Sequence, residues 1–372
     1  MLAQTATCTA DSVGALVRTL PLYGAGADEV PLGRLIGSGL DARQYTDLSR
    51  VEPGALTTPG GDLFIRTTAP DGLPAPATWT IGLRGVDGAA VATIALAALA
   101  AEATDQGTHV IECAGNANPW NFGLMSAATF RGVTLERVLA RAARPAAATA
   151  VLVTGHDHAV ATTTRSLPGA SWILPHASLA TTGAFLATHL DGQPLTPDHG
   201  APVRLVVPGW YGCAWIKWVH DLQWLDDDAR STTQMLEFAF RTHQDGIPMQ
   251  SRDYQVPAID VAAMPVRVEE RRVSGATEYR IVGLMWGGQR AAAGTAQPTR
   301  PPVERLLIRF GSRDAGVPVT LCDAAPGDPW RLWTYRWRPE SPGPYDITLK
   351  VAEPAMPTRR LDLSYYIRRV HI

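Results

Sequence analysis

A cysteine directly after a short apolar run is the first candidate for chemistry in this sequence. Cys113 follows Val110-Ile111-Glu112, so we expect it on the loop after a strand, with its sulfur facing a cleft. A thiolate in that place can act as a nucleophile or as a ligand for a soft metal. The alternative is that Cys113 is a small buried core residue, which is the usual fate of a free cysteine.

Three cationic or proton-donating side chains surround two glycine-containing turns further along the chain. They are His199, Arg204 and Lys217, in the stretch 198–218. Arginine offers a planar pair of donors to a phosphate, lysine offers a point charge, and glycine lets backbone amides approach an anion. The stretch is therefore a candidate anion-binding site, and the alternative is a surface loop with solvated charges.

A third polar segment, Gly155-His156-Asp157-His158, contains two histidines separated by one residue. Such a pair can bind zinc or iron, with Asp157 as a further ligand or as a partner of a ligand. Exposed loop histidines are the alternative, because no further histidines follow at the spacing of a metallohydrolase.

The elements that must position these segments divide the chain into two parts. Residues 1–255 mix strands such as 151–153 and 205–207 with helical spacing over 135–142. From residue 256 onward, strand-length apolar runs are separated by turns rich in proline and glycine, at 266–272, 279–286, 303–310, 330–337 and 345–351. We therefore predict an α+β protein, with a mixed α/β domain over 1–255 followed by an all-β sandwich over 256–372.

Composition and charge exclude several classes of protein. The 372 residues include 33 basic and 35 acidic side chains, so the net charge of −2 gives no basic footprint for nucleic acid. Apolar residues make up 46% of the chain, which is enough for a buried core. The apolar stretch 89–101 is too short to span a membrane and is predicted to form a packed helix. We expect neither a nucleic-acid nor a membrane partner.

The four cysteines are widely scattered and have no metal-binding spacing. A disulfide framework is not expected in a chain of this size, so Cys8, Cys213 and Cys322 are expected to be packing residues, with the role of Cys213 left open. No N-terminal targeting segment is visible. We expect a cytoplasmic protein, or a periplasmic one if a leader was removed before this numbering begins.

Taken together, the three polar segments resemble the sulfite oxidase family of molybdopterin enzymes. Cys113-Ala114-Gly115-Asn116 resembles the molybdenum–cysteine loop of that family, and 120–133 is similar to the stretch that follows it. Asp157, in Gly-His-Asp, matches a pterin contact, and 198–218 is similar to the family's most distinctive block. The C-terminal part resembles the family's immunoglobulin-like dimerisation domain.

The resemblance implies a molybdenum–molybdopterin cofactor and a role for each matching residue. Cys113 would supply a thiolate to the metal, which is soft enough to favour sulfur. Arg66 aligns with the family's arginine near the reactive oxygen, and Tyr254 with its active-site tyrosine. Arg369 resembles an arginine of a C-terminal family block. The residues implied to hold the cofactor are Asn116, Asp157, His199, Arg204 and Lys217.

The resemblance also implies a reaction class and partners. The reaction would be a two-electron or oxygen-atom transfer at a cysteine-bound molybdenum, on a small oxyanion or a sulfoxide-like compound. A separate cytochrome or other electron carrier would be needed, because the sequence has no haem-attachment motif. A homodimer formed through the C-terminal domain is expected.

Two departures from the family pattern concern the substrate. Ala117 and Asn118 follow the cysteine loop where family members have basic residues, and Arg66 is followed by two threonines rather than by Asn-His. Loss of one bidentate arginine contact to an anion costs about 1.5–3 kcal/mol. The resemblance therefore supports the cofactor more strongly than it supports sulfite as the substrate.

Two alternatives from other classes stay open at this point. The fold could serve as a non-catalytic binding protein, although retention of the cysteine, Asp157 and the basic block argues against a decayed site. A metallohydrolase centred on His156 and His158 would require further ligands to converge on that pair.

Overall fold

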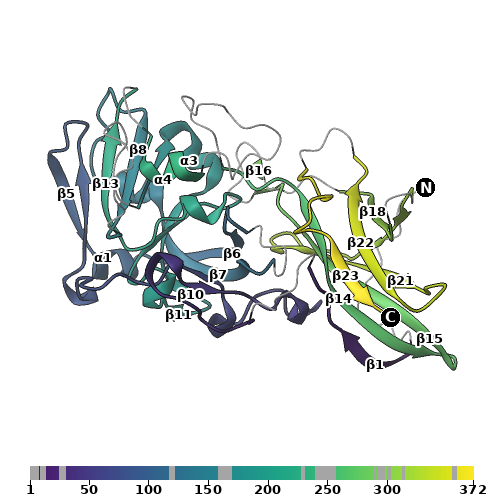
Figure 1. Cartoon of the computed structure of the whole chain (residues 1–372). Helices are drawn as coiled ribbons and strands as arrows, with labels where there is room; N and C mark the ends of the chain where they lie inside the picture. The colour runs from purple at the N-terminus through teal and green to yellow at the C-terminus, as the bar shows by residue number, and fades with distance from the viewer. Residues whose placement is uncertain are drawn as a thin grey trace.

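The computed structural model consists of two lobes in which strands predominate (Figure 1). The N-terminal lobe contains most of residues 31–238, and the C-terminal lobe contains most of residues 257–372. The structure describes residues 8, 14–24, 31–116, 122–157, 170–227, 231–238, 257–288, 290–291, 298–299, 303–311, 315–353 and 358–372. Within these ranges, no helix reaches the length and apolarity needed to cross a bilayer.

Two five-stranded sheets form the N-terminal lobe. The first has the order β5 (Ala90–Ala95), β4 (Thr80–Arg84), β13 (Val219–Leu225), β8 (Ala150–Gly155) and β9 (Ser171–Pro175). The second has the order β11 (Gln193–Pro194), β10 (Phe185–Leu190), β7 (Met125–Thr134) and β6 (Thr104–Glu112), with β12 (Arg204–Val206) paired to β10. Strands were predicted at 151–153 and 205–207, and β8 and β12 confirm them.

Short helices connect these strands, and one predicted helix is wrong over half its length. α2 (Leu135–Leu139) begins where predicted, after Thr134, whose hydroxyl accepts a hydrogen bond from the amide of Arg137 at 3.4 Å. The stretch 89–101 instead forms β5 and then α1 (Leu96–Ala101). β5 pairs with β4 along its length, so tertiary pairing overrides the helical propensity of its alanines. Among the described residues, the other α-helices are α3 (His176–Thr182) and α4 (Thr233–Phe238).

The C-terminal lobe contains two antiparallel sheets. One has the order β1 (Ala15–Leu20), β14 (Ala262–Val273), β15 (Ala276–Trp286), β21 (Arg331–Trp337) and β20 (Thr320–Leu321). The other has the order β19 (Val317–Pro318), β18 (Leu306–Arg309), β22 (Pro344–Val351) and β23 (Arg368–His371). All five strands expected after residue 256 are present. Whether this lobe is immunoglobulin-like stays a prediction.

Aromatic side chains fill the space between these two sheets. Trp337 of β21 meets Tyr345 of β22 edge to face, with ring centroids 4.8 Å apart, and Phe310 stacks on Trp337 at 4.5 Å. Trp333 is fully buried against Gly283 of β15, where a Cβ atom would lie 2.1 Å from the indole ring. A side chain at 283 would therefore displace this tryptophan from the core.

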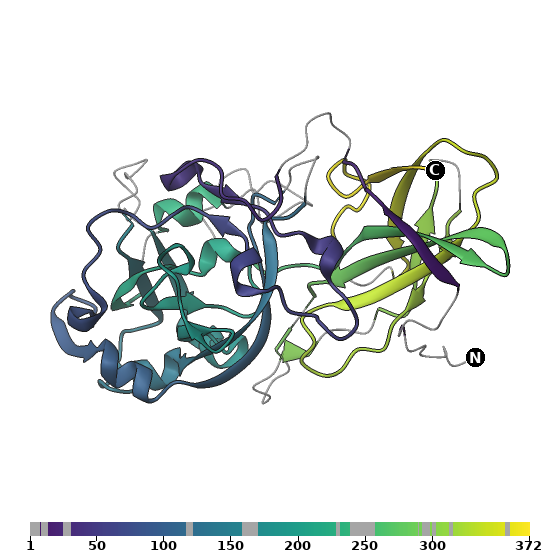
Figure 2. The ribbon, with the colours of Figure 1, turned by 90° about the horizontal axis from the view of Figure 1, so that it is seen from below.

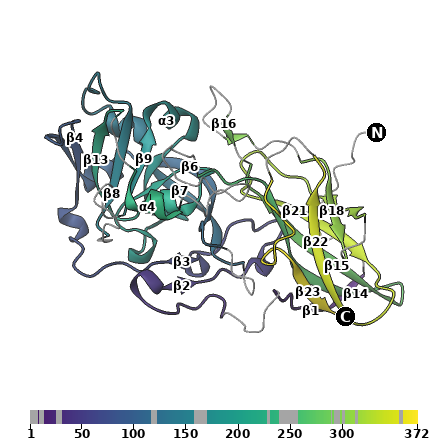
Figure 3. The same ribbon diagram turned by 45° about the horizontal axis from the view of Figure 1, so that its top comes forward.

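The N-terminal segment contributes to both lobes. β1 pairs with β14, and Figure 2 shows β1, in dark purple, lying with the strands of the C-terminal lobe. β2 (Arg43–Gln44) pairs with β3 (Ile65–Arg66) beside the N-terminal lobe (Figure 3). The predicted boundary at 255/256 lies at the edge of residues outside the described ranges and stays a prediction. The one further pair is β16 (Arg290–Ala291) with β17 (Pro298–Thr299) among the described strands.

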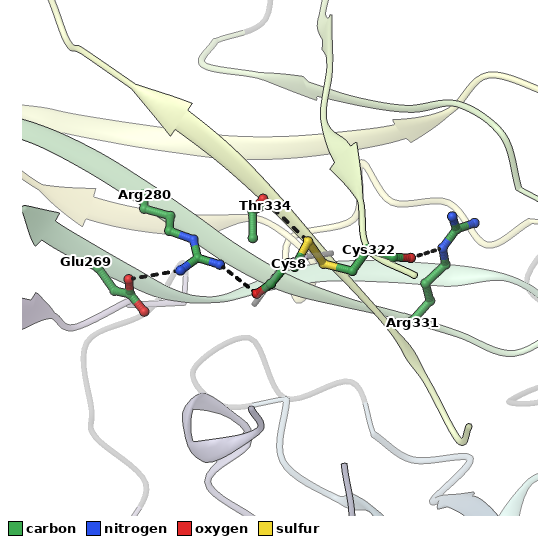
Figure 4. The surroundings of a disulfide bond; sticks show 6 residues. All are labelled: Cys8, Glu269, Arg280, Cys322, Arg331 and Thr334. Carbon is green, nitrogen blue, oxygen red and sulfur yellow. Dashed lines mark hydrogen bonds and ion pairs between the residues drawn. A yellow bond between two sulfur atoms is a disulfide. The ribbon is translucent and has the colours of Figure 1, made fainter. Parts of the chain in front are cut away.

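Two of the cysteines form a disulfide, which corrects the expectation that both are ordinary packing residues. Cys8 and Cys322 are bonded across a sequence separation of 314 residues (Figure 4). The amide of Cys322 donates to the carbonyl of Leu332 at 2.9 Å, and its own carbonyl accepts from Arg331 Nε at 2.7 Å. Arg280 donates to the carbonyl of Cys8 at 3.4 Å. Because the two cysteines meet only through the strand order of this lobe, their spacing in the sequence gave no signal.

Replacing Cys8 and Cys322 together by serine should destabilise the C-terminal lobe. A long closed loop loses conformational entropy in the unfolded chain, so the disulfide should contribute about 2–5 kcal/mol. The measurement is urea unfolding of the wild type and the double variant, each with and without reductant. Reductant should lower the wild-type midpoint and leave the variant unchanged. Equal midpoints for all four samples would contradict the disulfide.

Candidate active site

A cavity of about 270 Å³ in the N-terminal lobe brings together most of the residues singled out in the sequence. It is lined from the ends of several strands and from the loops that follow them. Of the predicted site residues, those that line it are Arg66, Cys113, Asp157, His199, Arg204 and Lys217. Residues that are up to 151 positions apart thus share one cavity.

Cys113 lies at the cavity because β6 ends one residue before it. Its amide donates to the carbonyl of Leu124 at 3.0 Å, and its carbonyl accepts from the amide of Asn116 at 2.9 Å. The sulfur accepts the amide of Gly115 at 3.3 Å. Burial raises the pKa of this thiol, and the nearby guanidinium groups of Arg66 and Arg43 act in the opposite direction. A bound metal ion would favour the thiolate outright.

Asn116 is buried directly behind the cysteine loop. Its side-chain oxygen accepts the amide of Leu124 at 3.1 Å, and its amide nitrogen lies 3.5 Å from the carboxylate of Glu112. It is absent from the cavity lining. These contacts hold the loop, and a direct contact of Asn116 with the cofactor stays a prediction.

Arg204 and Lys217 place two cations at the cavity, and their described hydrogen bonds go to backbone carbonyls. Arg204, on β12, donates to the carbonyls of His199 at 3.0 Å and of Trp215 at 3.2 Å. Lys217 donates to the carbonyls of Thr67 at 2.5 Å and Asp198 at 2.9 Å, and its Nζ also lies 3.3 Å from that of Arg66. Carbonyl oxygens orient these groups but carry no formal charge, and the carboxylates of Asp198 and Asp157 oppose part of the positive charge of Lys217.

Loss of hydration at the cavity lowers the pKa values of the basic cluster formed by His199, Arg204 and Lys217. Desolvation, and then the charge of Arg204, lower the pKa of Lys217 to about 7. The same two causes, followed by Lys217, lower the pKa of His199 to about 4, and desolvation lowers that of Arg204 to about 10. A bound anion would oppose each of these shifts, so the cluster gains most when an anion occupies the cavity.

A glycine turn brings the members of the basic cluster close together. Gly200 has a φ of +99°, and a Cβ atom there would lie 3.0 Å from Cβ of Arg204 and 3.1 Å from Lys217. A glycine at this position therefore avoids both backbone strain and a crowded contact. The first of the two glycine turns noticed in the sequence thus serves close packing at the cavity.

Arg66 enters the cavity from β3, beside a residue with unusual backbone geometry. Its guanidinium donates to the carbonyl of Leu40 and to the hydroxyl of Thr67, the latter at 3.2 Å. Thr67 has a φ of +77°, which is rare for a β-branched residue, and its carbonyl is the one held by Lys217. Arg66 and the basic cluster are therefore coupled through one short backbone segment.

Asp157 lines the cavity at the end of β8, whereas the neighbouring histidine points elsewhere. The His156 ring packs against Trp79 and His220, with centroids 4.8 Å and 4.2 Å away. His158 lies outside the described residues. No group of three or more His, Cys, Asp or Glu side chains that could hold a metal ion occurs in the described part of the chain. The metallohydrolase alternative requires His158 and is not tested by the described residues.

Two further predicted residues are not at the cavity as described. Arg369 forms an exposed pair with Asp346, at 2.7 and 2.8 Å, on the outer sheet of the C-terminal lobe. Arg369, which resembles an arginine of a C-terminal family block, lies on β23, which pairs with β22, and is absent from the cavity lining. Tyr254 lies outside the described residues.

Several lining residues were missed by sequence reasoning. α4 contributes Gln234 and Glu237, and the loop after β12 contributes Cys213, which is buried. Gln234 Nε2 donates to the carbonyl of Cys213 at 2.6 Å, which joins α4 to the cavity wall. α4 has no motif, so the sequence offered no signal for it.

The donor set of the cavity fits a molybdopterin carrying molybdenum. Two buried nitrogens, Nε2 of His199 and Nε of Arg204, have no hydrogen-bond partner among the described residues. Such groups are costly unless a partner is supplied, and a phosphate oxygen is a suitable acceptor. Cys113 offers a sulfur to the metal at another part of the same wall.

Comparison with known proteins agrees with this geometry. Residues 68–233 match the model of the oxidoreductase molybdopterin binding domain. The mitochondrial sulfite oxidases of Macaca fascicularis and Homo sapiens are 28% and 27% identical in alignments 310 residues long, which cover 77% of this chain and 53% of each relative. The chain thus spans about half the length of these relatives.

A solved structure has the same fold over most of the chain. The crystal structure of the sulfane dehydrogenase SoxCD from Paracoccus pantotrophus matches with a TM-score of 0.67 and 18% identity, covering 92% of this chain and 86% of that one. At that identity the match establishes the fold alone. The matched domain and the relatives together indicate an oxidoreductase with a molybdopterin cofactor that is similar to the sulfite oxidases.

Proposed function

We propose that this chain catalyses a two-electron or oxygen-atom transfer at a molybdenum ion bound by the thiolate of Cys113. The observation that carries the proposal is the convergence of Cys113 and the basic cluster of His199, Arg204 and Lys217 on one cavity. A soft sulfur ligand and an anion-binding cluster are the two features that a metal on a phosphorylated pterin requires. When bound, the molybdenum supplies the two-electron redox chemistry.

The protein's own residues would position the cofactor and the substrate and stabilise their charges. Arg204 and Lys217 would bind the cofactor phosphate, with His199 as a neutral donor at pH 7 because its pKa is about 4. Asp157 would accept hydrogen bonds from the pterin. Arg66 would stabilise negative charge on the substrate. We propose that Tyr254 also acts on the substrate.

The substrate that we propose is a small oxyanion or a sulfoxide-like compound. Arg66 supplies one cation to the cavity, whereas Glu237 of α4 adds a carboxylate to the same wall. Ala117 and Asn118 replace basic residues of the family pattern. If the cofactor phosphate occupies Arg204 and Lys217, Arg66 is the cation left for the substrate, and Asp41 and Glu237 also line the cavity. Such a site should bind a dianion such as sulfite less well than a singly charged or neutral compound. Comparing sulfite with a sulfoxide as reactants tests this.

Two kinds of partner belong to the proposal. Electrons would pass to a separate cytochrome or other electron carrier. A homodimer through the C-terminal lobe would double the mass measured by light scattering, and the mass of a single chain would disprove it.

We further propose that the chain works in an oxidising compartment, in place of the cytoplasmic location expected from the sequence. The support is the Cys8–Cys322 disulfide, since such bonds are rare where glutathione and thioredoxin keep thiols reduced. Alkylation of thiols in intact cells that produce the chain should leave Cys8 and Cys322 unlabelled until reductant is added. Labelling of both before reduction would contradict the proposal.

The substitution Cys113→Ser should abolish activity and remove the metal–thiolate absorption. A serine hydroxyl is a harder ligand with a much higher pKa, so it cannot replace a thiolate on a soft metal. The measurement is molybdenum content by elemental mass spectrometry, together with the visible spectrum, of protein from a host that makes molybdopterin.

Cys213→Ser is the matched control for that experiment. Cys213 is also buried and lines the same cavity, and burial raises the pKa of its thiol well above the ordinary value. This variant should retain the absorption. An unchanged spectrum in Cys113→Ser, or wild-type protein without molybdenum, would refute the proposed ligand.

Anion binding should weaken as pH rises through the pKa of Lys217. The ammonium is charged below about pH 7 and neutral above it, and only the charged form attracts an anion. Sulfate keeps its charge over this range. Its dissociation constant on cofactor-free protein should therefore rise about tenfold per pH unit above pH 7.

The sequence offers a matched control for this experiment, because the second lysine, Lys350, is exposed on β22. Titration calorimetry with sulfate should show that Lys217→Met binds weakly at every pH, whereas Lys350→Met behaves as the wild type. A wild-type dissociation constant for sulfate that does not change with pH would show that Lys217 does not take part in anion binding.

A further inference from the structure

A fully buried ion pair joins the cysteine loop to the C-terminal lobe, away from the cavity. Glu112, the last residue of β6, has no exposed surface. Arg359 donates from its two terminal nitrogens to the two carboxylate oxygens, both at 2.7 Å. Two parallel charge-assisted hydrogen bonds of this kind fix the relative orientation of both groups.

Both charged groups have further partners that come from separate parts of the chain. Trp286, at the end of β15, donates from its indole nitrogen to Glu112 at 2.8 Å. Arg359 also donates to the hydroxyl of Tyr366 at 2.8 Å and lies over the ring of Tyr211, 4.9 Å from its centroid. The pair is thus enclosed by both lobes.

Burial of two charges makes this pair sensitive to the loss of either partner. Replacement of one partner leaves the other charge without water and without a counter-ion, whereas replacement of both by neutral groups avoids that penalty. A buried pair therefore stabilises one geometry more than it adds net stability. The geometry fixed here is that of the residue next to Cys113.

The carboxylate is connected to the cysteine loop in two ways. Glu112 immediately precedes Cys113 in the chain, and Asn116 at the far end of the loop lies 3.5 Å from its carboxylate. Asn116 in turn accepts the amide of Leu124, whose carbonyl accepts the amide of Cys113. A displacement of Glu112 would consequently change the direction of the cysteine sulfur.

We infer that Glu112 and Arg359 are positioning residues for Cys113: the guanidinium from the C-terminal lobe fixes the carboxylate behind the cysteine loop, and thereby aims the sulfur into the cavity. The inference rests on the proposed role of Cys113 as metal ligand. It gives the C-terminal lobe a part in the active site in addition to any part in dimerisation. Figure 1 shows β6 and β7 on the side of the N-terminal lobe that faces the C-terminal lobe.

The test compares Arg359→Met, Glu112→Gln and the double variant as holoenzymes. Each single variant should retain molybdenum, alter the Mo(V) electron paramagnetic resonance signal, and lower kcat by about 10- to 100-fold, as loss of a residue behind a metal ligand typically does. KM should change little, because substrate contacts are intact. The double variant should lose less than the product of the two single effects, since no uncompensated charge remains.

Arg369→Met is the matched control, because it breaks a bidentate pair on the surface of the same lobe, with Asp346. It should leave the Mo(V) signal and kcat unchanged. Arg359→Lys keeps the charge but cannot bridge both carboxylate oxygens, so it should fold and still show an altered signal. It is the variant to measure if Arg359→Met does not fold.

The outcomes separate this inference from the proposed function. Wild-type Mo(V) signals and kcat in Arg359→Lys and Glu112→Gln, with only a lowered melting temperature, would overturn the positioning role. If the Cys113→Ser variant instead gives the same Mo(V) signal as the wild type, the ligand assignment on which the inference rests is overturned.

Discussion

A carboxylate with no exposed surface is stable in its charged form only beside a cation, and the cation for Glu112 comes from 247 residues away. The Glu112–Arg359 pair therefore requires that β6 and the segment around residue 359 meet in one arrangement. Because Trp286 and Tyr366 complete the same contact, the end of β15 is held as well. One buried contact thus joins the two lobes at the residue that precedes Cys113.

The cavity on the other side of that loop follows a different electrostatic principle. Arg204 and Lys217 make their described hydrogen bonds to carbonyl oxygens, which orient a cation but do not neutralise it. The lowered pKa values of Lys217 and His199 record the cost of this arrangement. An anionic cofactor would offset that cost. Burial of these cations therefore disfavours the empty cavity and favours cofactor binding. The ion pair of Glu112 and Arg359 lies behind the cysteine loop, whereas the cations of Arg204 and Lys217 line the cavity.

The C-terminal lobe is stabilised by aromatic packing and by a covalent link. Trp333 and Trp337 fill its interior, and the Cys8–Cys322 disulfide attaches the beginning of the chain to the end of β20. β1 adds a hydrogen-bonded edge to the same sheet. Residues from the start of the chain are thereby fixed to the lobe that also contains Arg359. This is the lobe from which we infer that Cys113 is positioned.

The sequence by itself predicted several residues that line the cavity and the alternation of strands and turns, because both predictions use local patterns. Cys113, Asp157, His199, Arg204 and Lys217 were identified from short motifs, and the strands after residue 256 from runs of apolar residues bounded by proline and glycine. Tertiary structure alone decided the rest. The strand at 90–95 forms because β4 lies beside it, and α4 reaches the cavity without a motif. The Cys8–Cys322 and Glu112–Arg359 pairs join residues hundreds of positions apart, where no spacing rule applies and only the folded chain brings the partners into contact.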